Sequence, residues 1–177
     1  MTAPARTRTV APAWPLYLAA FAIAAVVAGA VGEAFSGGSL AELGIPDPGA
    51  ATTVGLPALR GVAWLLMALA TGSFLLSAFL IPPKQTQQDL NGARLTVDGH
   101  LASRTGAHAS AGIALIGLVM IPLVLSDVSG QPLKTVLFEA AAWSQALDQV
   151  ADARVWLIVA VFAAIVAAFG YAAVSYT

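Results

Sequence analysis

The sequence predicts an all-α integral membrane protein, a bundle of four membrane-spanning helices. Of its 177 residues, 59% are hydrophobic and only 10% are charged, whereas about a quarter of the residues of an ordinary soluble domain are charged. Four apolar runs each approach or exceed the roughly 20 residues that a helix needs to cross the hydrocarbon core. None of them alternates apolar and polar residues, as the strands of a membrane barrel do.

The predicted helices differ in how clearly the sequence marks their ends. Pro82-Pro83 ends the second run, and Pro122 lies inside the third, where we expect a kink because membrane helices tolerate proline. The first run could be a cleaved signal peptide, but its apolar core is longer than a signal requires and favours a retained helix. After a tail of residues 1–13, we expect helices at about 14–32, 59–81, 106–126 and 155–176.

The first two helices are joined through a stretch rich in helix breakers, GIPDPGAATTVGLP at Gly44–Pro57. Proline and glycine favour tight turns there, which suits either a compact connector or a loop shaped for a ligand. Leu56-Pro57 is predicted to start the second helix, because the missing N–H of a proline is harmless in a first turn.

The distribution of Lys and Arg predicts that both termini are cytoplasmic. With that orientation the outer segments hold three cations: Arg60, Lys134 and Arg154. The inner segments hold five: Arg6, Arg8, Lys84, Arg94 and Arg104. The inner loop of residues 84–104 is predicted to be a polar connector with at most one short helix.

Residues 133–150 of the second outer loop carry apolar side chains at helical spacing. The pattern predicts one amphipathic helix in the plane of the membrane interface, with Trp143 at the level of the headgroups.

Small residues recur every fourth position on two predicted helices, which favours close helix contact, although chance can produce such stripes in a chain rich in alanine. The two stripes are Ala20, Ala24, Ala28 and Gly32 on the first helix, and Ala160, Ala164, Ala168 and Ala172 on the fourth.

The order of three motifs resembles the N-terminal CopD-like (copper resistance D) domain of actinobacterial proteins in which a CtaG-like cytochrome c oxidase assembly domain follows. The motifs are GIPDPGAATTVGLP, LSAFLIPP and PLVLSDVSGQPL, and the resemblance covers about residues 44–174. Ala111-Gly112 departs from the bulky residue expected early in the third helix. The resemblance implies copper handling in a bacterial plasma membrane, with cytochrome c oxidase, its assembly factors or a downstream CtaG-like domain as partners. Since no charge follows Arg154, we also expect the chain to be part of a longer protein.

Cu(I) favours thioether and imidazole ligands, and the chain has no cysteine. Met67 and Met120 are predicted at similar depth below the outer ends of the second and third helices, where they could share one ion or simply fill gaps in the core. His100 and His108 could receive copper at the cytoplasmic side, or be an ordinary loop histidine and a histidine at a helix start.

A second candidate group consists of charges at the outer rim, which could pair for structure or line an entrance. Its members are Glu33, Arg60, Asp127 and Arg154. Asp127 also matches the Asp-x-x-Gly turn of the resembling family.

Other function classes find little support. The net charge of −1 and the lack of a basic patch argue against nucleic acid. No catalytic motif is present, so we expect no enzyme, and two histidines in one neighbourhood do not suit a bis-histidine haem. Three functions stay open: copper handling or transport, an accessory or scaffold subunit of a respiratory oxidase complex, and a plain membrane anchor.

Overall fold

The computed structural model confirms the all-α membrane fold. It describes residues 14–36, 44, 48–81 and 97–175. Four helices of that part of the chain are long and apolar enough to cross a membrane, so the chain is a multi-pass membrane protein. They are α1 (Trp14–Ser36), α3 (Ala50–Leu75), which continues as the π-helix η1 (Leu76–Leu80), α4 (Val97–Ser129) and α7 (Ala151–Ser175).

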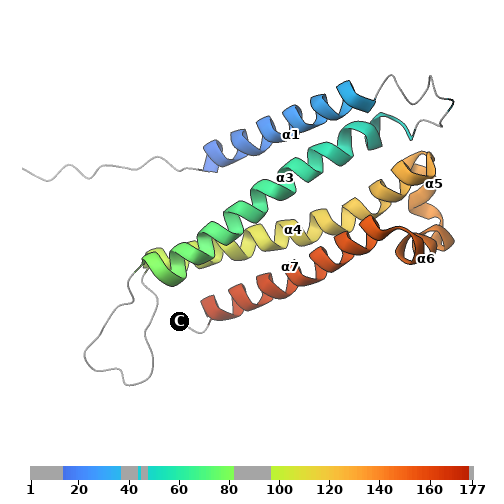
Figure 1. Cartoon of the computed structure of the whole chain (residues 1–177). Coiled ribbons are helices and arrows are strands. Elements are labelled where there is room, and N and C mark those ends of the chain that lie inside the picture. The colour runs from blue at the N-terminus through green and yellow to red at the C-terminus, as the bar shows by residue number, and fades with distance from the viewer. Residues whose placement is uncertain (1–13, 37–43, 45–47, 82–96, 176–177) are drawn as a thin grey trace, which may run out of the picture.

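The spanning helices pack in the order of the chain. Figure 1 shows α1 beside α3, α3 beside α4 and α4 beside α7, with each helix antiparallel to the one before it. Helix α4 therefore has neighbours on two sides and holds most of the core, whereas α1 is largely exposed along its length. We call the end of the bundle that carries α5 and α6 the outer end, and the opposite end the inner end. Helix α1 begins and α7 ends at the inner end (Figure 1).

Helix α3 begins earlier than the sequence suggested. It starts at Ala50, after Gly49 with a φ of 91°, so Pro57 lies inside the helix and the predicted start at Leu56-Pro57 is wrong. The ring of Pro57 packs where α1 offers a glycine: a Cβ on Gly32 would lie 2.3 Å from Pro57 Cγ. Pro57 therefore forms part of the contact between α1 and α3 and does not mark the start of a helix, since membrane helices tolerate proline in their interior.

Helix α4 also begins earlier, at Val97. Residues 97–104, predicted to belong to a polar connector, form its first turns, so His100 is helical, as is His108. The helix continues through Pro122 to Ser129, and the prediction that this proline is no stop is confirmed. The tail of residues 1–13, together with Lys84 and Arg94, lies outside the described residues.

Small residues set the close helix contacts, but only one predicted stripe is correct. The α1 stripe faces α3 at its outer half, because a Cβ on Gly61 would lie 3.0 Å from Ala28 Cβ and 3.4 Å from the Ala24 carbonyl oxygen. On α7 the prediction fails after Ala160: the other three alanines of that stripe, Ala164, Ala168 and Ala172, are exposed.

The buried face of α7 follows a seven-residue repeat. Buried or half-buried residues recur at positions 153, 160 and 167 and at 156, 163 and 170. A strict four-residue spacing drifts around a helix of 3.6 residues per turn, whereas a seven-residue spacing nearly keeps its direction. Gly117 of α4 packs against this face, since a Cβ there would lie 2.9 Å from Ala160 Cβ.

The second outer loop forms two short helices instead of the single helix predicted. Helix α5 (Leu133–Phe138) ends where Glu139 adopts an extended conformation, and α6 (Ala140–Gln149) follows. The indole N–H of Trp143 donates to the Val136 carbonyl at 3.2 Å, and both residues pack onto the outer part of the core. The apolar positions of the loop therefore close the outer end of the bundle, while Phe138 stays exposed.

Candidate functional site

The contacts between α3 and α4 fix the heights of the two methionines. Thr52 Oγ1 lies 2.7 Å from Ser126 Oγ, Leu66 packs on Gly112, and the Ser77 hydroxyl donates to the Gly99 carbonyl at 2.9 Å. In this antiparallel register Met67 is level with Ala111. Met120 lies nine residues further along α4, about 14 Å away along the axis. The structure therefore does not bring Met67 and Met120 together.

The two methionines occupy different surroundings. Met120 is fully buried in the outer core. Met67 packs in a separate inner cluster with Ala70, Ala109 and Ile113, and its side chain lines a groove. Of the two thioethers, that of Met67 is the one open to an incoming ion.

The histidines do not form a shared site either. His100 and His108 lie eight residues apart on α4, about 12 Å along the axis. His108 Nδ1 lies 2.7 Å from the Arg104 carbonyl oxygen, and its ring meets Tyr171 edge-on with 5.3 Å between centroids. Among the described residues, no three His, Asp or Glu side chains are grouped so that they could hold a metal ion.

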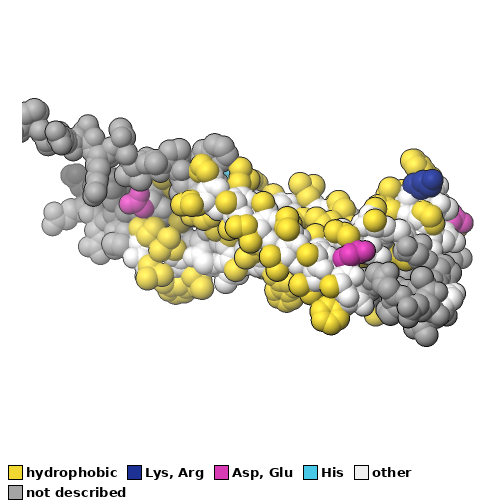
Figure 2. Space-filling model, turned by 90° about the horizontal axis from the view of Figure 1, so that it is seen from above, with side chains coloured by type: hydrophobic (Ala, Val, Ile, Leu, Met, Phe, Trp, Pro, Cys, Tyr) yellow, Lys and Arg dark blue, Asp and Glu magenta, His cyan; other side chains and the backbone are white. Residues whose placement is uncertain are grey.

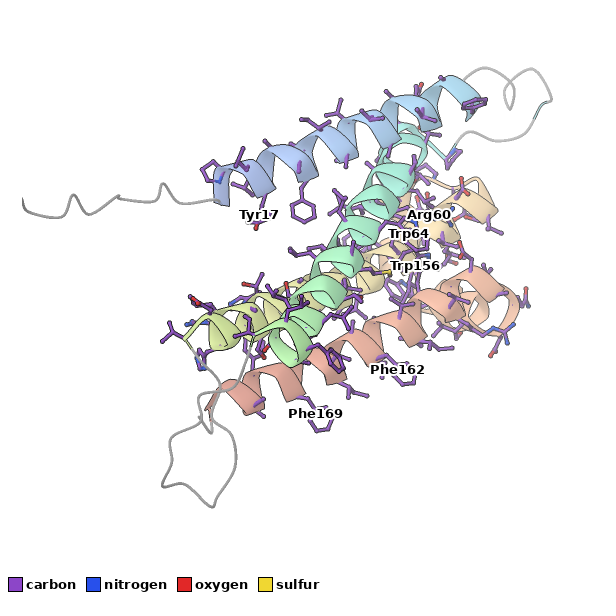
Figure 3. All side chains as sticks on the ribbon, turned by 60° about the vertical axis from the view of Figure 1, so that its left-hand side comes forward. Tyr17, Arg60, Trp64, Trp156, Phe162 and Phe169 are labelled. Atoms are coloured by element: carbon purple, nitrogen blue, oxygen red, sulfur yellow. The ribbon has the colours of Figure 1, made fainter. Side chains whose placement is uncertain are left out.

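At the outer rim, the ion pair includes an acidic residue that was not among the predicted rim charges. Arg60 of α3 pairs with Asp152 of α7, and both side chains are about half-exposed. Glu33, Asp127 and Arg154 are exposed and make no ion pair with another described residue. The signal that could have found Asp152 is its place one turn before the buried Trp156 on α7; Figure 3 labels Arg60 and Trp156 among the side chains of the bundle.

The groove lies between α3 and α7, with α4 as its floor, and has a volume of about 330 Å³. Figure 2 shows how apolar the surface of the bundle is, with few charged side chains on the face in view. The floor of the groove contributes Ser110 and Ile113. Its walls come from Met67, Ala70, Thr71 and Phe74 of α3 and from Ile158, Val159, Phe162, Ala163 and Val166 of α7.

The chemistry of the groove is simple. Its lining has no charged group, two hydroxyls, one thioether and two aromatic rings. Such a lining can hold an apolar molecule, donate a hydrogen bond from Ser110 or Thr71, and offer a soft ligand from Met67. It has no general base or nucleophile paired for catalysis.

No family model matches the chain, and no curated protein or solved structure matches it either.

Proposed function

We propose that this chain is a copper-handling membrane domain of a bacterial plasma membrane, linked to copper resistance or to the copper supply of cytochrome c oxidase. The resemblance of its motifs to CopD-like domains supports this function. The observation that carries the proposal is the position of Met67, whose thioether lines a groove that opens sideways from the bundle. Cu(I) prefers such soft ligands.

One thioether does not complete a coordination shell, and Met120 is too far away to add the second. The remaining donors therefore come from a partner: cytochrome c oxidase, one of its assembly factors or a downstream CtaG-like domain. In this proposal the domain passes Cu(I) on through a transient contact with Met67 and does not store it.

The test is the copper content of the detergent-purified chain after anaerobic loading with Cu(I). Met67→Leu is expected to lose the copper that the parent retains. Met120→Leu is the matched control, because it replaces the buried thioether, which does not line the groove, with a side chain of similar volume and is expected to retain copper. A parent that retains no copper, or a loss confined to Met120→Leu, would contradict the proposal.

A second function is favoured by one observation. The alanines at positions 164, 168 and 172 leave a stripe of small residues exposed on α7, and such stripes let membrane helices approach closely. This suits an accessory subunit that docks on a respiratory oxidase. Ala168→Leu is then expected to reduce the amount of oxidase that co-purifies with the chain, whereas Val155→Leu, at an exposed position on a different face of α7, leaves it unchanged.

A further inference from the structure

The groove between α3 and α7 is a recess that contacts close at both ends. Arg60, Met67 and Phe74 are spaced seven residues apart on α3, and Asp152, Val159 and Val166 repeat this spacing on α7. Residues at this spacing share one face, so the Arg60–Asp152 pair joins the two walls above the groove. At the inner end the Phe74 ring lies over two glycines: Cβ atoms on Gly106 and Gly170 would lie 2.9 Å and 3.4 Å from Phe74 Cζ.

The floor of this recess carries a hydroxyl that has no hydrogen-bond partner among the described residues. Ser110 is only 2% exposed and lines the groove. Thr105 and His108 in the same helix bond the carbonyls four residues before them, but the Ser110 hydroxyl makes no hydrogen bond with any described residue. Among the described residues, every fully buried side-chain nitrogen or oxygen has a hydrogen-bond partner. Since the Ser110 hydroxyl has none, its oxygen is not fully buried and is accessible from the groove.

The depth of Ser110 restricts what could use that hydroxyl. It lies six residues, about 9 Å, along α4 from Arg104, and sixteen residues, about 24 Å, from Ser126. In a hydrocarbon core about 30 Å thick, this places it inside the apolar region. Water is scarce there, and an unmade hydrogen bond is unfavourable. A natural occupant therefore carries an acceptor that resides within the hydrocarbon.

We propose that this recess binds the ring of an isoprenoid quinone, with the Ser110 hydroxyl donating to a quinone carbonyl. The ring is apolar, uncharged and carries carbonyl acceptors, which matches a lining without charge. Phe74 and Phe162 lie at its sides and favour an aromatic guest. The isoprenoid tail leaves through the open side of the groove into the bilayer.

Two other membrane occupants fit less well. A transmembrane helix is 10–12 Å wide along its whole length, but the recess extends only from Met67 to Phe74, about 10 Å, before the bundle closes. The acyl chain of a phospholipid can enter, but its ester carbonyls stay in the polar interface, so the Ser110 hydroxyl would find no acceptor.

The experiment has two parts, both on the full chain purified in detergent from bacterial membranes. Solvent extracts are analysed by absorption and mass spectrometry for quinones and phospholipids. Binding is then titrated with a short-chain naphthoquinone through the quenching of tryptophan fluorescence. Ser110→Ala is expected to weaken binding about three- to tenfold, the effect of one lost hydrogen bond.

Two further variants keep the test specific. Ala163→Leu adds bulk inside the recess and is expected to abolish most of the quenching. Ser73→Ala removes a buried hydroxyl of α3 that does not line the groove and is expected to leave quinone affinity unchanged. Phospholipid as the sole extracted lipid, or equal affinity in the parent and in Ser110→Ala, would overturn the proposal. The result does not depend on copper, because no copper is added.

Discussion

Thr52 and Ser126, both fully buried, join the outer ends of α3 and α4 through a hydrogen bond of 2.7 Å. Ser126 also donates to the Gln131 carbonyl at 2.6 Å. Since Ser126 has one hydroxyl proton and uses it for that carbonyl, Thr52 is the donor to Ser126. The chain of two bonds links α3, α4 and the turn at Gly130, where φ is +64°.

Removing the Thr52 hydroxyl is expected to weaken this outer link. Thr52→Val keeps the side-chain shape and leaves Ser126 its carbonyl partner, so the expected loss is about 0.5–1.5 kcal/mol of unfolding free energy, as for one hydrogen bond. The measurement is unfolding in mixed micelles by added SDS. Thr105→Val is the control, because Thr105 is exposed and its hydroxyl donates to the Leu101 carbonyl within its own helix. Equal stability of Thr52→Val and the parent would show that the bond contributes nothing.

The contact of α4 with α7 depends on the absence of a side chain at Gly117. A Cβ there would lie 2.9 Å from Ala160 Cβ and 3.0 Å from the Trp156 carbonyl oxygen. We expect Gly117→Ala to destabilise the bundle by about 1–3 kcal/mol, although alanine is the better helix former.

Gly72 provides the matched comparison in the same unfolding assay. A Cβ at Gly72 has no described neighbour within 4 Å, so Gly72→Ala is expected to be neutral or stabilising by up to about 1 kcal/mol. If both alanine variants changed stability alike, tight packing at Gly117 would not be the cause.

The Arg60–Asp152 pair is expected to couple α3 to α7. In a double-mutant cycle with Arg60→Gln and Asp152→Asn, the expected interaction energy is positive but below about 1 kcal/mol, because both side chains are partly exposed to solvent. The same cycle with Arg154→Gln in place of Arg60→Gln should give no interaction energy. An interaction energy as large in the second cycle as in the first would show that it comes from the overall charge of the rim and not from the Arg60–Asp152 ion pair.

The orientation can be tested directly because the chain has no cysteine. Glu139→Cys introduces a thiol at an exposed position of the outer end, and Asp98→Cys introduces one at an exposed position of the inner end. With cytoplasmic termini, a membrane-impermeant maleimide should label the first variant in intact cells and the second only after lysis. The reverse pattern would invert the topology predicted from the positive charges.

The number and nature of the spanning helices could be predicted because apolar length is a strong signal. The starts of α3 and α4 could not. Pro57 lies within α3 and packs against Gly32, which has no side chain to obstruct the ring and lies 25 residues earlier in a different helix. The last described helical residue of the second span is Leu80, in keeping with the end predicted from Pro82-Pro83, whereas the start predicted at Leu56-Pro57 is wrong.

The site was harder to predict for a related reason. Met67 and Met120 have similar predicted depths only when the second helix starts at about residue 59, whereas α3 begins nine residues earlier, at Ala50, so Met67 lies deeper in the bundle than predicted. Ser110 carries no sequence signal that separates it from other helical serines. Its proposed role depends on the groove that it shares with Phe74 of α3 and Val159 of α7.

The packing of α1, α3, α4 and α7 in chain order also has a consequence for biosynthesis. Each new helix that enters the membrane finds its principal partner in the helix that entered just before it. Contacts between neighbours in sequence close short loops and form quickly, so the bundle can assemble stepwise as the chain leaves the ribosome. The contact between α3 and α7 forms last, because it needs α7 in the membrane. Only then can Arg60 pair with Asp152, and only then is the groove at Ser110 enclosed on both sides.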